Sequence, residues 1–130
     1  MFLTDYNEVS HRTIIIDEDE QTGWAYLTKP YTQSIDMDCW LYNKINAPND
    51  YKITSPQELP PPVPQKFLKQ DYNAVTNMNV DKMSFKWSPD GESVYILIDG
   101  EILALIDANS RNSFNVNLIA DCAWCKPFVS

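Results

Sequence analysis

The stretch MSFKWSPDGESVYILIDGEILALID, residues 83–107, decides the fold because it contains three strand-like runs separated by two tight turns. SPDG at residues 88–91 has the residue preferences of a type I turn. Asp99–Gly100 is typical of a two-residue type I′ turn, which needs positive φ at both positions. The flanking runs are rich in strand-forming residues. We therefore expect strand, turn, strand, turn and strand.

The Asp99–Gly100 turn also predicts the register of its hairpin, because side chains alternate between the two faces of a strand. The predicted pairs are Ile98–Glu101, Ile96–Leu103 and Val94–Leu105 on one face, and Leu97–Ile102 and Tyr95–Ala104 on the other. Apolar pairs occupy both faces. We therefore expect this hairpin to be central in its sheet and covered on both sides.

Earlier segments also have the composition of β-structure. Residues 11–29, HRTIIIDEDEQTGWAYLTK, predict a hairpin whose acidic loop ends at a turn glycine. Residues 36–45, DMDCWLYNKI, predict a third strand, with Trp40 and Tyr42 on a half-exposed face. A last strand is expected at about 114–119, and we assign no strand before residue 11.

Residues 46–65, NAPNDYKITSPQELPPPVPQ, are excluded from a sheet interior by six prolines, which cannot donate to a β-ladder. We expect a Pro-rich crossover between two halves of the structure. At most one or two short helices accompany the strands. The prediction is a single domain, 1–130, that is mainly β: an antiparallel meander or β-sandwich of about six to eight strands.

The charge is strongly negative. The formal net charge is −8, and residues 1–38 carry −6 of it. Nucleic acids and anionic membranes are disfavoured as partners, because both require basic groups. No run approaches the roughly 20 apolar residues of a membrane span, and no signal peptide is recognisable. Three cysteines, an odd number, fit a reducing compartment, so we expect a cytoplasmic protein without a cofactor.

The C-terminal segment ADCAWCKPF, residues 120–128, contains two of the three cysteines. AWCKP resembles the thioredoxin signature, but Phe128 stands where the second cysteine of that signature would be, so no redox role follows. If residues 119–125 form a strand, Cys122 and Cys125 point to opposite faces. Zinc bound by Cys39, Cys122, Cys125 and His11 remains an alternative.

Catalysis has little support in the sequence. A single histidine, His11, has to serve any triad, and no G-x-S-x-G motif is present. The acidic loop DEDEQTG, residues 17–23, lacks the ligand order of an EF-hand. We expect the protein not to be an enzyme.

A wider resemblance runs from Gly23 onward. GWAYL, DCWLYNKINAP, the Pro-rich crossover and FKWSPDGESV occur in an order similar to that of a family of small, uncharacterised bacterial cytoplasmic proteins. Small acidic proteins of this type often act as immunity proteins against secreted toxins. The resemblance implies an immunity role.

The favoured hypothesis is a non-enzymatic protein-binding module, with an immunity or inhibitor protein against a basic toxin as its sharpest form. Acidic residues would steer a basic partner and aromatic residues would anchor it. The candidate contact residues are Asp17, Glu18, Asp19, Glu20, Asp36, Asp38, Tyr26, Tyr31, Trp40 and Tyr42. The alternatives are a metal- or small-molecule-binding β-protein that uses the three cysteines, and a self-associating structural protein such as a homodimer.

Overall fold

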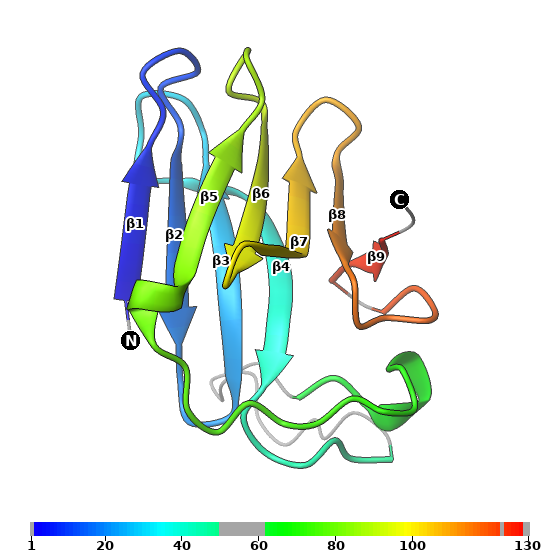
Figure 1. Ribbon diagram of the computed structural model, residues 1–130. Helices are drawn as coiled ribbons and strands as arrows, with labels where there is room; N and C mark the ends of the chain where they lie inside the picture. The colour runs from blue at the N-terminus through cyan, green and yellow to red at the C-terminus, as the bar shows by residue number, and fades with distance from the viewer. Residues whose placement is uncertain (1, 50–61, 123, 129–130) are drawn as a thin grey trace.

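The chain forms two β-sheets (Figure 1). The computed structural model describes residues 2–49, 62–122 and 124–128. Within these ranges there are nine strands and two three-residue 3₁₀ helices, η1 (Gln65–Phe67) and η2 (Val80–Lys82), and no longer helix. The described part of the chain has no helix with the length and apolar character of a membrane span. The prediction of a mainly β protein is confirmed; the described residues contain no more than the two short helices that we expected, but nine strands instead of the predicted six to eight.

The first sheet has the strand order β1-β2-β3-β4, and every neighbouring pair is antiparallel. Its strands are β1 (Phe2–Tyr6), β2 (Thr13–Glu18), β3 (Thr22–Thr28) and β4 (Ile35–Asn43). In β2, Ile14 and Ile16 are fully buried, whereas Ile15 points the other way and Asp17 is exposed. This alternation defines an inner face that enters the core and an outer face.

The second sheet has the strand order β5-β6-β7-β8-β9. Its strands are β5 (Met83–Trp87), β6 (Ser93–Ile98), β7 (Glu101–Asp107), β8 (Asn112–Asn115) and β9 (Lys126–Pro127). Most neighbours are antiparallel, but β8 and β9 pair in parallel. The purely antiparallel prediction was wrong for this last pair. A parallel neighbour requires the chain to return to the starting end of β8 before β9 begins.

Buried side chains from both sheets form one cluster. β4 contacts β7 and β8 of the other sheet, and Figure 1 shows the second sheet lying across the first. Leu41 of β4, Ile96 of β6 and Ile106 of β7 are all fully buried in this cluster. The two sheets therefore share a core.

The central hairpin confirms the turn and only part of the register. Asp99 and Gly100 both have positive φ, 52° and 80°, as a type I′ turn requires. Ile98–Glu101 and Leu97–Ile102 pair as predicted, but the register shifts between Ile96 and Leu97. The observed pairs beyond the shift are Ile96–Ala104, Tyr95–Leu105 and Val94–Ile106, so the predicted pairs Ile96–Leu103, Val94–Leu105 and Tyr95–Ala104 were wrong.

The register shift has a packing reason. Leu103 and Ala104 are consecutive residues and both are buried, which strict alternation does not allow. β6 and β7 lie inside the sheet, as predicted. Their second face is only half-buried, and Ile102 is 39% exposed, so the prediction of cover on both sides was wrong.

Two predictions about the first sheet need correction. Residues before position 11 do form a strand, β1, which pairs with β2 over its whole length. Trp40 and Tyr42 are not half-exposed: their exposures are 0% and 1%. A register shift between Gly23 and Trp24 sets Tyr42 opposite Gly23, and a Cβ atom at position 23 would come within 2.4 Å of the Tyr42 ring.

The Pro-rich crossover stays a prediction, because residues 50–61 lie outside the described residues. The part that is described, Pro62–Pro64, is buried. η1 follows it at residues 65–67.

Asn43, at the end of β4, joins this returning chain to the first sheet. Its side chain is fully buried and both of its polar atoms are hydrogen-bonded: Oδ1 accepts from Trp40 Nε1 (3.0 Å) and Val63 N (2.9 Å), and Nδ2 donates to Val63 O (2.9 Å). Its backbone N–H donates to the Tyr72 hydroxyl, and its carbonyl accepts from Val75 N. The buried side-chain amide of Asn43 thus makes the hydrogen bonds to the backbone of Val63 that a neighbouring strand would otherwise make.

We predict that Asn43→Ala lowers the free energy of unfolding by about 2–4 kcal/mol, because it leaves Trp40 Nε1 and both backbone groups of Val63 buried without partners. Urea denaturation measures the loss. Asn46→Ala is the control: Asn46 is exposed and makes no side-chain hydrogen bond among the described residues, so a change within about 0.5 kcal/mol is expected. Equal midpoints for the two variants would contradict this role of Asn43.

Candidate functional site

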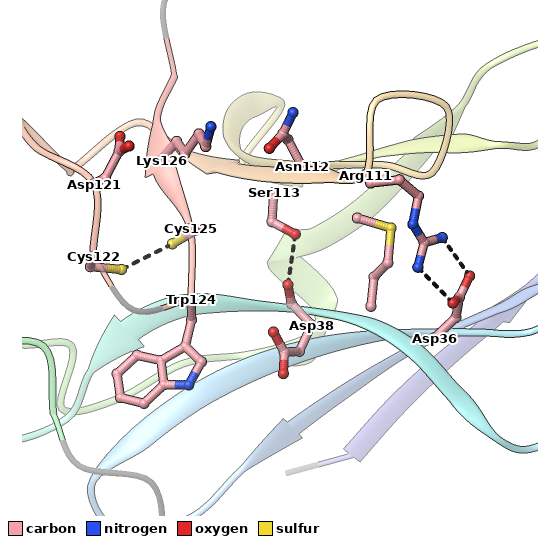
Figure 2. A pocket seen from close by; sticks show the side chains of 11 residues that line it. Asp36, Asp38, Arg111, Asn112, Ser113, Asp121, Cys122, Trp124, Cys125 and Lys126 are labelled. Carbon is pink, nitrogen blue, oxygen red and sulfur yellow. Dashed lines mark hydrogen bonds and ion pairs between the residues drawn. The ribbon is translucent and has the colours of Figure 1, made fainter.

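A pocket of about 330 Å³ lies between β4, the start of β8 and the C-terminal segment (Figure 2). It combines charged side chains with two thiols. The lining residues are Asp36, Met37, Asp38, Arg111, Asn112, Ser113, Asp121, Cys122, Trp124, Cys125 and Lys126. Several residues predicted for separate roles thus meet at one place.

Side chains of β8 close the free edge of β4 and form the floor of this region. Ser113 Oγ donates to Asp38 O at 2.6 Å, and Asn115 Nδ2 donates to Trp40 O (2.9 Å) and Leu41 O (3.0 Å). These carbonyls lie on the edge of the first sheet, where a further strand would otherwise pair. The two sheets are therefore joined at this edge by side chains instead of a backbone ladder.

One end of the pocket carries a cluster of ion pairs, which we call the Arg12–Asp36 clamp: Arg12, Asp36, Glu92 and Arg111. Arg12 NH1 donates to Asp36 Oδ2 (2.8 Å) and Thr28 O (3.0 Å), and Arg12 Nε donates to Glu92 Oε2 (2.7 Å). Arg111 binds both carboxylate oxygens of Asp36, at 2.8 and 2.9 Å. The hydrogen bonds from Arg111 and then Arg12 hold the pKa of Asp36 well below its usual range.

The other end of the pocket holds two thiols in contact. Cys122 Sγ lies 3.6 Å from Cys125 Sγ, and Cys122 N–H donates to Cys125 O at 2.9 Å. Residues 119–122 and 124–125 are not strand, so the condition under which these cysteines would point to opposite faces is not met. Cys39 is buried in β4, and its thiol interacts with that of Cys125.

This environment keeps the thiols protonated. The hydrogen bond with Cys125, followed by burial, raises the pKa of Cys122. The hydrogen bond with Cys122 lowers the pKa of Cys125, but the Cys39 thiol and burial outweigh it and leave the pKa raised. Since the thiolate is the reactive form, neither cysteine resembles an activated nucleophile. No histidine is among the described residues that line the pocket.

The four predicted metal ligands do not all meet, because His11 lies apart from the three cysteines. His11 lies in the loop between β1 and β2, where Tyr6 and Tyr31 contact its ring. The described residues contain no group of three or more His, Cys, Asp or Glu side chains that could hold a metal ion. The four-residue site of the alternative hypothesis is therefore not assembled.

The predicted acidic residues occupy different places. Glu18 accepts from the Tyr42 hydroxyl (2.9 Å) and lies 3.5 Å from Lys44 Nζ. Asp19 accepts from the backbone of Gln21 and Thr22, closing the β2–β3 loop. Asp36 belongs to the clamp, at the opposite end of the first sheet from that loop (Figure 1). The other three acids of the predicted set are exposed: Asp17, Glu20 and Asp38.

The predicted aromatic anchors also divide. Trp40 and Tyr42 are core residues, so they are not surface anchors. Tyr31 is 77% exposed and stacks on His11, with ring centroids 4.2 Å apart. Tyr26 is half-buried on the outer face of β3, directly opposite Asp38 in β4. Only Tyr26 shares a surface with exposed acids of the predicted set.

Sequence reasoning missed the clamp and the thiol contact. Arg12 and Glu92 are 80 residues apart, and no local pattern links them. The thiol contact did have a local signal, because C-x-x-C spacing places two cysteines at the ends of a two-residue turn. The assumption of a continuous strand concealed that signal.

A scan of protein-family models, a search of curated proteins and a search of solved structures each found no match to this chain. The resemblance to small bacterial immunity-type proteins therefore stays a prediction.

We predict that Asp36→Asn destabilises the protein at pH 7 by about 2 kcal/mol, the scale of a charge-assisted hydrogen bond. The pKa of Asp36 is lowered on folding from 3.8, so its ionised form stabilises the native state above that pH. This contribution is lost as the pH falls further. The difference in urea midpoint between wild type and variant should therefore shrink between pH 5 and pH 2.

The control for this titration is Asp121→Asn, which also removes a carboxylate from the pocket lining. Asp121 is exposed and makes no ion pair among the described residues. This variant should follow the wild-type stability at every pH. A constant difference between wild type and Asp36→Asn from pH 7 to pH 2 would contradict the electrostatic role of Asp36.

Proposed function

We propose that this chain is a non-enzymatic protein-binding module that recognises a basic partner protein through the outer face of the first sheet. We call this surface the acidic face and define it by Ile15, Asp17, Tyr26 and Asp38. In its sharpest form the partner is a basic toxin and the chain its immunity protein in a bacterial cytoplasm.

The observation that carries the proposal is a tyrosine surrounded by carboxylates. Tyr26 lies opposite Ile15 on one side and Asp38 on the other, and Asp17 lies opposite the neighbouring Trp24. Burial raises the pKa of Tyr26, and the charges of Asp17, Asp38 and Asp19 raise it further. Among the described residues no lysine or arginine forms an ion pair with these three aspartates.

Carboxylates without an ion-pair partner among the described residues, placed around a positioned aromatic ring, are suited to binding a basic surface. Trp24 stacks on Tyr26 with ring centroids 6.4 Å apart, and Trp24 is itself buried, so the tyrosine ring has a firm support. Tyrosine side chains are frequent anchors of protein interfaces, and surrounding charges mainly accelerate association with an oppositely charged partner. The residue Asp38 as a whole is exposed to solvent. Its carboxylate is nevertheless partly shielded from water by neighbouring protein atoms, and this desolvation raises its pKa.

The acidic face also needs a rigid support. We infer that the two sheets form a β-sandwich, closed by the Pro-rich crossover, which holds the acidic face rigid. The protonated thiols and the absence of histidine from the described pocket lining favour binding over catalysis. Nucleic acid and membranes are not expected as partners, because the chain carries a net charge of −8. A homodimer remains the alternative assembly.

The test compares two variants with the same change of charge. We predict that Asp17→Lys/Asp38→Lys abolishes capture of a basic protein from the native cell lysate at low salt, with at least tenfold less recovered than with wild type. The control, Asp81→Lys/Glu101→Lys, reverses two exposed acids outside the acidic face. It should capture the partner as wild type does.

Salt adds a second criterion, because surface charges are screened at high ionic strength. Capture by wild type should weaken as salt increases. Circular dichroism checks that both variants fold. Equal recovery with both variants, or equal loss with both, would refute recognition through the acidic face.

A further inference from the structure

Cys122 and Cys125 have thiols in contact and are joined by a backbone hydrogen bond. The hydrogen bond from Cys122 N to Cys125 O is 2.9 Å long, and two residues separate the cysteines in the sequence. The sulfur atoms are already 3.6 Å apart, so side-chain rotation is the main movement needed.

We infer that Cys122 and Cys125 form a reversible intramolecular disulfide, and that the C-terminal turn is a site of thiol–disulfide exchange with low-molecular-weight disulfides. This role is independent of the acidic face and of any partner protein.

Access favours Cys122 as the first thiol to react. Cys122 is half-buried and lines the pocket of about 330 Å³, whereas Cys125 is 5% exposed and Cys39 is fully buried. Oxidised glutathione is a suitable probe, because it is a small disulfide that can supply the oxidising equivalents.

The exchange balances in two steps. Cys122 releases its proton to water, and its thiolate attacks one sulfur of glutathione disulfide, breaking that bond and releasing one glutathione thiolate. Cys125 then releases its proton and attacks the Cys122 sulfur of the mixed disulfide, which expels the second glutathione. Two protein thiols are oxidised by two electrons, and one glutathione disulfide is reduced to two thiols.

The surroundings determine the rate and the partner. The raised pKa values keep both thiols protonated at neutral pH, so exchange should be slow and should accelerate as the pH rises. Cys39 also interacts with Cys125, but its complete burial denies it a first reaction with solvent. The pair that reacts is therefore Cys122–Cys125.

The test incubates the reduced full chain with oxidised glutathione at pH 8.5 and then counts thiols in denaturant. We predict that wild type falls from three free thiols to one, with the mass of one internal disulfide and no retained glutathione. Peptide mapping should link Cys122 to Cys125. Dithiothreitol should restore three thiols, and circular dichroism should show an unchanged fold throughout.

Two variants complete the design. Cys39→Ala should fall from two thiols to none, whereas Cys122→Ser should keep two. A Cys39–Cys125 disulfide, a lasting glutathione adduct on Cys122, or a disulfide between two chains would overturn the inference. So would a native chain that stays fully reduced under conditions in which the denatured chain oxidises.

Discussion

The buried guanidinium of Arg12 is the constraint around which one end of the molecule is arranged. A charged group removed from water is costly unless partners surround it, and Arg12 is only 8% exposed. Its partners come from the end of β3, the start of β4 and the β5–β6 loop. Asp36 then binds Arg111 of the β7–β8 loop. Both sheets are thereby held in one relative position.

The hydrogen bonds that cover the free edge of β4 depend on the same ion pairs. Once the clamp sets the start of β4 beside the start of β8, Ser113 and Asn115 can reach the β4 carbonyls. The chain beyond β8 then turns back over this edge, where Trp124 packs edge-on against Trp24 with ring centroids 5.0 Å apart. The pocket lies between the C-terminal segment and β4, and Cys122 and Cys125 belong to this segment. The C-terminal segment therefore lies next to the aromatic support of the acidic face.

Local chemistry explains which features could be predicted from sequence. The Asp99–Gly100 turn was predictable because few residues tolerate positive φ at two successive positions. The strand β2 was predictable because three consecutive β-branched residues, Ile14–Ile16, favour an extended backbone, but the sequence does not show which of the three are buried. The shift at Ile96 was not predictable, since it reflects the volume that Leu103 and Ala104 fill together in the shared core. The position of a β-bulge depends on tertiary packing, which cannot be deduced from a short segment of sequence.

The candidate site was less predictable than the fold for a related reason. Trp40 and Tyr42 have polar atoms that suit a surface, and their burial depends on partners for those atoms: Asn43 for Trp40 Nε1 and the more distant Glu18 for the Tyr42 hydroxyl. Asp36 looked like a free surface acid until Arg12 and Arg111 were found beside it. The acids of the proposed surface, Asp17 and Asp38, could be named from charge alone, but not their position on either side of Tyr26.

The close approach of Gly23 and Tyr42 has an evolutionary consequence. The phenol ring occupies the volume that any larger residue at position 23 would need. A smaller residue at position 42 would relieve the crowding, but it would also remove the hydroxyl that donates to Glu18. Related sequences should therefore keep this glycine and tyrosine as a covarying pair, with the acid at position 18 changing only alongside them.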